Sequence, residues 1–159
     1  MGLVVVAVCV LAGCGGSSSK YVPTTVVDGR VVPSWYPEIE SDAQTSEEAM
    51  TALGACRTST ANQRDLSRCL FSQASLLDVF WGLISDLAGA AAKHGPCVRE
   101  LDALQRASHP AALAAGEVKP GTIPTTVSAL SHQERMIELS GTTERVSYLA
   151  VVRCVNEIR

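Results

Sequence analysis

Cysteine is the residue type with the most chemistry to offer in this chain of 159 residues, which contains six cysteines. No two of them form a Cys-x-x-Cys motif, so the spacing does not place two thiolates on one turn, as a structural zinc site needs. Disulfide formation and modification of a single sulfur are the chemistries that this spacing leaves. The six are Cys9, Cys14, Cys56, Cys69, Cys97 and Cys154.

The first 13 residues form an apolar run that ends in small residues directly before a cysteine. The run is too short to cross a bilayer core, which needs about 20 residues, and it is typical of the core of a signal peptide. Its end, Leu11-Ala12-Gly13-Cys14, resembles the lipobox of bacterial lipoproteins, which lipoprotein signal peptidase recognises after the cysteine has been acylated. The resemblance implies that residues 1–13 are removed as a signal peptide and that Cys14 carries the lipid.

A lipid on this sulfur implies a chain that is exported and held at the extracytoplasmic face of the cell membrane. Each buried methylene contributes about 0.8 kcal/mol, so two or three acyl chains make the attachment effectively permanent. The membrane is therefore an expected partner, through the N-terminal lipid. The anchored domain meets other molecules of the envelope at a raised effective concentration.

The four cysteines of the body are expected to form two disulfides, because an exported chain enters an oxidising space. Of the three possible pairings, geometry favours one. The 28 positions from Cys69 to Cys97 lie mostly in one predicted long helix, which at 1.5 Å per residue separates the two by about 40 Å. A disulfide tolerates about 7 Å between Cα atoms. Cys56 lies near the start of the same helix, so we expect Cys56–Cys69 and Cys97–Cys154.

No local motif indicates an enzyme or a cofactor site. The sequence has no Gly-x-Ser-x-Gly elbow, no His-Glu-x-x-His, no phosphate-binding loop and no Rossmann fingerprint. The three histidines, His94, His109 and His132, lie beside glycine, proline or a helix cap, which favours surface roles over ligation. We therefore expect no catalytic residue, metal or cofactor, although a site assembled from distant residues would leave no local trace.

The net charge of −3, from 16 acidic and 13 basic residues, gives no electrostatic footprint for nucleic acid. Residues 14–40 are expected to form a flexible tether with a short hairpin, since Asp28-Gly29 between β-branched residues is the strongest short hairpin signal. Trp35 and Tyr36, near its end, are expected to cap one end of a helical core. The alternative for these aromatics is contact with a partner or with the membrane surface.

Residues 41–159 predict an all-α fold, a small up-and-down bundle of four to five helices, one of them long, that disulfides hold together. Capping boxes predict helix starts at three places, Pro96 suits a fourth, and Gly141 suits a helix end that divides the last part of the chain into two helices. Pro110 is expected to stop or redirect the third helix. The capping boxes begin at Thr45, Thr60 and Ser131.

These features together predict a non-enzymatic binding or interaction module of the cell envelope, whose partner is an envelope protein or a surface ligand. One alternative is a carrier of an apolar ligand or haem, in a cavity lined by Leu77, Phe80, Trp81 and Ile84, although these residues suit an ordinary core better. A second alternative is a superinfection exclusion lipoprotein of the phage type, which the general layout resembles. An enzyme with a non-local site is a third.

Overall fold

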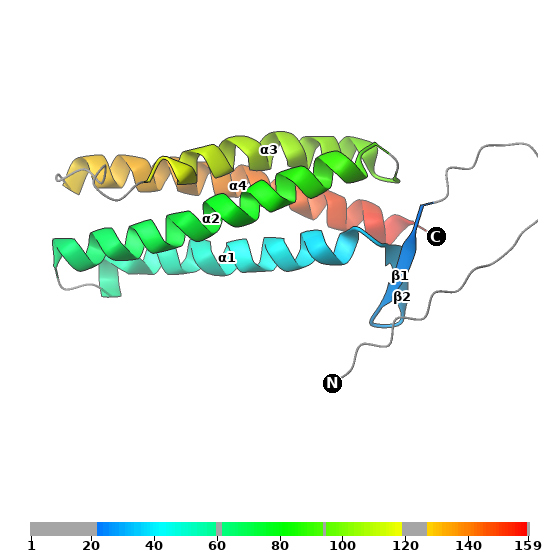
Figure 1. Cartoon of the computed structure of the whole chain (residues 1–159), viewed down its shortest axis with the longest axis horizontal. Coiled ribbons are helices and arrows are strands. Elements are labelled where there is room, and N and C mark those ends of the chain that lie inside the picture. The colour runs from blue at the N-terminus through cyan, green and yellow to red at the C-terminus, as the bar shows by residue number, and fades with distance from the viewer. Residues whose placement is uncertain (1–21, 60–61, 94, 119–126, 159) are drawn as a thin grey trace, which may run out of the picture.

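The protein is an up-and-down bundle of four helices, preceded by a β-hairpin (Figure 1). The computed structural model describes residues 22–59, 62–93, 95–118 and 127–158. This architecture confirms the predicted fold class, a small all-α bundle with two disulfides. In chain order, the elements are β1 (Thr24–Val27), β2 (Arg30–Pro33), α1 (Tyr36–Ser59), α2 (Gln63–Ala91), α3 (Val98–Gly116) and α4 (Val127–Glu157).

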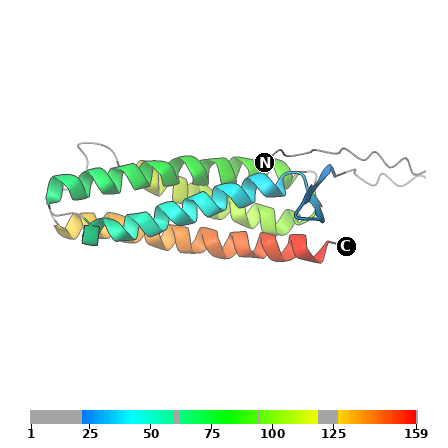
Figure 2. The ribbon, with the colours of Figure 1, turned by 90° about the horizontal axis from the view of Figure 1, so that it is seen from below.

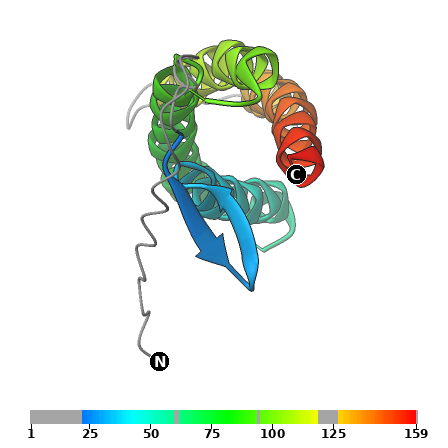
Figure 3. The ribbon, with the colours of Figure 1, turned by 90° about the vertical axis from the view of Figure 1, so that its right-hand side faces the viewer.

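The four helices follow one another around the bundle, and the ring that they form is open between its first and last members. In the view along the long axis, α1, α2, α3 and α4 form an arc with a gap between α4 and α1 (Figure 3). Contacts are most numerous between α2 and α3 and far fewer between α1 and α4. We call the line along which α1 and α4 face each other the α1–α4 seam.

Large apolar side chains from all four helices fill the space between them. Small residues on α2 and α3 allow these two helices to approach closely: the Cα of Gly89 faces the side chain of Gln105, and the Cα of Gly116 faces the side chain of Asp78. The alanines Ala74, Ala88, Ala111 and Ala115 are fully buried. The largest fully buried apolar side chains are Trp81, Ile39, Leu53, Leu77, Ile84, Leu101, Leu104, Ile137 and Val151.

The predicted hairpin is present, and it closes one end of the bundle. Val26 pairs with Val31, and the turn residues Asp28 and Gly29 have φ values of +47° and +78°, as the two-residue turns favoured in hairpins require. Val32 is buried against the core. Arg30 Nη1 donates a hydrogen bond of 2.9 Å to Asn156 Oδ1, so the hairpin is also tied to the end of α4 (Figure 2).

The first helix begins earlier than predicted, at Tyr36, so residues 36–40 belong to the helical body and the tether was predicted to be too long. Pro37 is compatible with this start, because the first turn of a helix has no use for the backbone N–H that proline lacks. Thr45 is therefore not a helix cap. Ser46 lies inside the helix, buried, and its hydroxyl donates to the carbonyl of Ala43 at 2.9 Å.

The start of α2 agrees with the prediction to within a few residues. Asn62 is its N-cap, and the Asn62 side chain accepts a hydrogen bond of 3.0 Å from the backbone N–H of Asp65. Thr60, the predicted cap, lies outside the described residues. The third helix starts at Val98 instead of Pro96, because Cys97 adopts a left-handed conformation with φ of +65°.

Two predicted helix breaks are wrong. Pro110 lies inside α3, which continues to Gly116, and its exposed position leaves the carbonyl that loses its hydrogen bond accessible to water. Gly141 lies inside α4, which is one helix where two were predicted. A Cβ at Gly141 would lie 3.0 Å from Trp81 Cζ2, so this glycine makes room for a neighbouring side chain and does not end a helix.

Both predicted disulfides are confirmed. Cys56 and Cys69 are bonded with their Cα atoms 5.8 Å apart, and Cys97 and Cys154 are bonded with their Cα atoms 5.9 Å apart. The first bond joins α1 to α2 at the end of the bundle far from the hairpin, and the second joins the start of α3 to the end of α4 beside the hairpin (Figure 1). Neither bond crosses the α1–α4 seam.

Within the described part of the chain, α2 alone has the length and apolar composition of a membrane-spanning helix. Core helices of bundles meet the same criterion. In this structure Leu77, Trp81 and Ile84 of α2 are packed inside the bundle. We therefore describe α2 as the central helix of the core.

Candidate functional site

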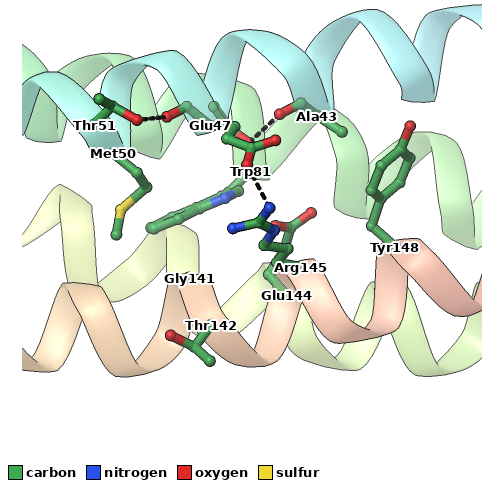
Figure 4. A pocket seen from close by; sticks show the side chains of 11 residues that line it. Ala43, Glu47, Met50, Thr51, Trp81, Gly141, Thr142, Glu144, Arg145 and Tyr148 are labelled. Carbon is green, nitrogen blue, oxygen red and sulfur yellow. Dashed lines mark hydrogen bonds and ion pairs between the residues drawn. The ribbon is translucent and has the colours of Figure 1, made fainter.

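A groove opens into the bundle along the α1–α4 seam, with a volume of about 250 Å³ (Figure 4). α1 forms one wall, α4 forms the other, and Trp81 of α2 lies at the bottom. Polar and apolar side chains both line it. They are Ala43, Ser46, Glu47, Met50, Thr51, Trp81, Thr142, Glu144, Arg145 and Tyr148, together with Gly141.

Glu144 is the most unusual residue of the groove, because its acidic side chain is only 4% exposed. Its Oε1 atom is buried and has no hydrogen-bond partner. Burial raises the pKa of this carboxyl from 4.5 to about 7; the indole N–H of Trp81 opposes the rise, and the negative charge of Glu47 adds to it. Glu144 is therefore an acid that changes its charge near neutral pH.

Trp81 forms the floor of the groove and contributes a second unsatisfied polar atom. The residue is fully buried, and its Nε1 has no hydrogen-bond partner. The indole N–H lies close enough to the carboxyl of Glu144 to lower its pKa as a hydrogen-bond donor does, although neither Nε1 nor Oε1 has a partner in good hydrogen-bond geometry. Buried polar atoms are nearly always paired, so two imperfectly paired atoms side by side make the bottom of the groove unusual.

Gly141 and Met50 shape the space next to the indole ring. A Cβ at Gly141 would lie 3.0 Å from Trp81 Cζ2 and 3.1 Å from Met50 Cε. Any side chain at this position of α4 would press on both neighbours. The glycine thus lets the ring of Trp81 and the thioether of Met50 reach the groove together.

An ion pair forms the rim. Arg145 Nη2 of α4 lies 2.8 Å from Glu47 Oε1 of α1, and both side chains are more than half exposed (Figure 4). A second ion pair crosses the seam between Arg57 of α1 and Glu134 of α4, whose carboxylate is buried. The α1–α4 seam is therefore held by ionic contacts at two places, with the groove at one of them.

Tyrosines close the groove at the end nearer the hairpin. Tyr148 lines the groove, and burial together with the negative charges of Glu40 and Glu144 raises the pKa of its phenol. Tyr36 donates a hydrogen bond of 3.0 Å to Glu40 Oε1, and burial raises its pKa as well. Both phenols are therefore neutral at physiological pH, and Glu144 is the acid of the groove whose pKa is raised into the neutral range.

A second depression, of about 630 Å³, lies at the hairpin end of the bundle and is mainly apolar. It is lined by residues of the hairpin, of the segment before α3 and of the C-terminal end of α4. Val31, Val98 and Ile158 leave much of their apolar surface exposed there. The hairpin end therefore exposes an apolar surface, whereas the groove contains a buried acidic side chain, Glu144.

Most of the residues that the sequence analysis singled out do not line the groove. Leu77, Trp81 and Ile84 are fully buried in the core and Phe80 is half-buried, and of these four Trp81 lines the groove. Trp35 packs on the core and Tyr36 is buried in it, so the expectation that they cap the core is confirmed. Cys14 and His94 lie outside the described residues, and His132 is exposed.

Sequence reasoning missed Glu47, Glu144 and Arg145. A signal for Glu144 is present, because Ile137, Glu144, Tyr148 and Val151 recur at helical spacing with an acid where an inward-facing apolar residue is expected. Among the described residues, no three His, Cys, Asp or Glu side chains gather as metal ligands. Comparisons with protein-family models, with curated proteins and with solved structures gave no match to this chain.

Proposed function

We propose that the protein is a lipid-anchored, non-enzymatic binding module on the outer face of the cell membrane. The observation that carries this proposal is the sequence Leu11-Ala12-Gly13-Cys14 at the end of an apolar run, which resembles a lipobox. Two disulfides in a small helical domain support it, because such bonds persist in oxidising compartments and are rare in the cytosol.

The length of the tether then defines which end of the bundle lies next to the bilayer. Eight residue steps separate Cys14 from Val22, where the described chain begins, and at 3.6 Å each they span at most about 29 Å in any conformation. The hairpin end of the bundle is thus kept beside the membrane, with its apolar depression close to the lipid headgroups. The groove lies on the flank of the bundle and stays accessible to soluble ligands.

The groove supports binding better than catalysis. In the part of the chain that the structure describes, its lining has one buried titratable acid and no cysteine or histidine that this acid could activate. The carboxyl of Glu144, which is nearly buried and forms no ion pair with the described residues, is the charged group that a ligand entering the groove would meet. We therefore assign the groove as the binding site of the module.

The anchor is tested by expressing the full chain in a bacterium fed a clickable palmitate analogue. The protein is expected to take up the label and to be found in the membrane fraction, and Cys14→Ser is expected to abolish both. Cys9→Ser is the matched control and keeps the label, because Cys9 lies in the segment that is removed. Unlabelled protein in the cytosol with residues 1–13 intact would contradict the proposal.

A further inference from the structure

We propose that the groove on the α1–α4 seam binds a small organic cation, an alkylammonium, whose charged head lies against the carboxylate of Glu144 and whose alkyl part lies on Met50, next to the buried ring of Trp81. This inference rests on the binding role proposed for the groove, but not on the lipid anchor. It names the class of ligand that the module takes.

The charges that face the groove favour a cation. α1 contributes Glu47, α4 contributes Glu144 and Arg145, and Trp81 of α2 and Tyr148 of α4 contribute neutral polar groups. The ion pair between Arg145 and Glu47 neutralises one acid, which leaves the charge of ionised Glu144 without a counter-ion in the groove. A buried carboxylate is costly unless a positive charge and hydrogen bonds compensate it, so a bound ammonium group gains the interaction that the protein itself does not provide.

An anion is disfavoured by the same arrangement. The positive group nearest to the groove, Arg145, is already engaged with Glu47 at 2.8 Å. An anion would also face the carboxylate of Glu144 at short range. The sign of the ligand's charge is therefore set by Glu144.

The apolar part of the lining favours an alkyl chain next to the charge. Met50 and Trp81 approach each other at the position where Gly141 has no side chain, and the ring of Tyr148 forms the wall at the other end. Aromatic faces attract cations within about 6 Å and bind alkylammonium groups well. The volume of about 250 Å³ suits a ligand of a few carbon atoms and is too small for haem.

Because Glu144 titrates near neutral pH, the affinity of the groove for a cation is expected to depend on pH. Its pKa is raised to about 7 by burial, so the carboxylate that attracts the cation is mostly protonated at pH 6 and mostly ionised at pH 8. An alkylammonium keeps its charge over this range, since amines of this kind resemble lysine, with a pKa of about 10.4. Affinity is expected to rise about tenfold from pH 6 to pH 8, in proportion to the ionised fraction of Glu144.

The test uses the full chain purified in detergent and n-butylammonium chloride as the probe, with binding measured by calorimetry at pH 8. Saturable binding is expected, and Glu144→Gln is expected to weaken it at least tenfold. Glu138→Gln, which changes an exposed acid on the same helix, is the matched control and keeps the affinity of the unchanged protein. Equal binding by the Glu144→Gln variant, or equal binding of uncharged 1-butanol, would overturn the proposal.

A second measurement does not depend on any variant. The indole N–H resonance of Trp81 is expected to shift on titration with butylammonium, while that of Trp35, which lies at the hairpin end, is expected to stay in place. No shift of the Trp81 resonance at saturating amine would also overturn the proposal. If the protein takes up no palmitate label but still binds the amine, the proposal of a lipid anchor is wrong and the proposal of a cation site stands. If it takes up the label but does not bind the amine, the cation site is wrong and the anchor stands.

The same ammonium head occurs on free amines and on lysine side chains of a protein partner. N-acetyl-lysinamide is therefore titrated beside butylammonium. If N-acetyl-lysinamide binds at least ten times more tightly than butylammonium, the natural ligand is a lysine side chain of a protein partner. Otherwise the natural ligand is a free amine. Both results support the cation site, and the absence of binding by both probes contradicts it.

Discussion

Two seams join the halves of this bundle, and they are built from opposite kinds of residue. One disulfide ties α1 to α2 and the other ties α3 to α4, so the molecule consists of two stapled helix pairs. Along the α2–α3 seam, small residues bring the two helices into close contact. Along the α1–α4 seam, two ion pairs cross a gap that contains the groove.

The difference separates a closely packed side of the bundle from the side that contains the groove. Close packing of buried apolar side chains is the main source of folding free energy, and the helices with the most contacts are α2 and α3. The α1–α4 seam has far fewer contacts. At this seam, Oε1 of Glu144 and the indole Nε1 of Trp81 are buried without a hydrogen-bond partner. Four predictions test whether this division between the two sides holds.

The largest loss of stability is expected from a cavity in the closely packed side. Leu104 of α3 is fully buried, and Leu104→Ala is expected to lower the free energy of unfolding by about 3 to 4 kcal/mol through lost burial and the cavity left behind. Urea unfolding followed by circular dichroism measures it. Leu113→Ala, at an exposed leucine of the same helix, is the control, and an equal loss there would contradict the division.

The next effect comes from Glu144 and depends on pH. Because the folded protein holds its pKa at about 7 against 4.5 in the unfolded chain, the folded state binds the proton more tightly. The stabilising contribution of protonated Glu144 is complete below pH 4.5 and is lost as the pH rises to about 7. That shift corresponds to about 3 kcal/mol. Glu144→Gln is expected to unfold at higher urea than the unchanged protein at pH 8 and at similar urea at pH 4.5.

A smaller effect is expected from the glycine that shapes the groove. A Cβ at position 141 would press on Trp81 and Met50, so Gly141→Ala is expected to destabilise the fold by about 1 to 2 kcal/mol despite alanine's higher helix propensity. At Gly82 of α2, a Cβ would meet nothing within 4 Å. Gly82→Ala is therefore expected to stabilise by about 0.5 to 1 kcal/mol in the same thermal unfolding assay. The same sign at both positions would refute the packing role of Gly141.

The smallest effect is expected at the rim. Glu47 and Arg145 are more than half exposed, and an exposed ion pair contributes less than about 1 kcal/mol. The double change Glu47→Gln with Arg145→Gln is expected to leave urea unfolding almost unchanged, because it removes both charges together. A loss comparable to that of Leu104→Ala would show that ionic contacts, and not packing, hold the α1–α4 seam.

Local signals were sufficient where a few neighbouring residues decide the structure. Asp28-Gly29 determines its own turn, and the uninterrupted apolar spacing of α2 was enough to predict both disulfides by distance alone. The same local rules failed at Thr45, Pro110 and Gly141, where burial of a neighbouring face or contact with another helix decides whether a helix continues.

The groove could not be predicted from the sequence for a related physical reason. Its residues lie on α1, α2 and α4 and are brought together only by the relative register of these three helices. A single glutamate at an inward-facing position of α4 is an anomaly that the sequence contains. What makes Glu144 a site is its burial beside the indole of Trp81, which packs closely on Gly141, and both features depend on tertiary packing.

The placement of the two disulfides also determines what a protease can release. A cut in the link between α1 and α2 leaves both pieces covalently joined through Cys56 and Cys69, and a cut between α3 and α4 leaves them joined through Cys97 and Cys154. Of the three connections between helices, the one between α2 and α3 is not bridged in this way, so a cut there gives two fragments that separate on a gel without reductant. Cleavage of the connection between Ala91 and Val98 therefore divides the bundle into its two disulfide-bonded helix pairs.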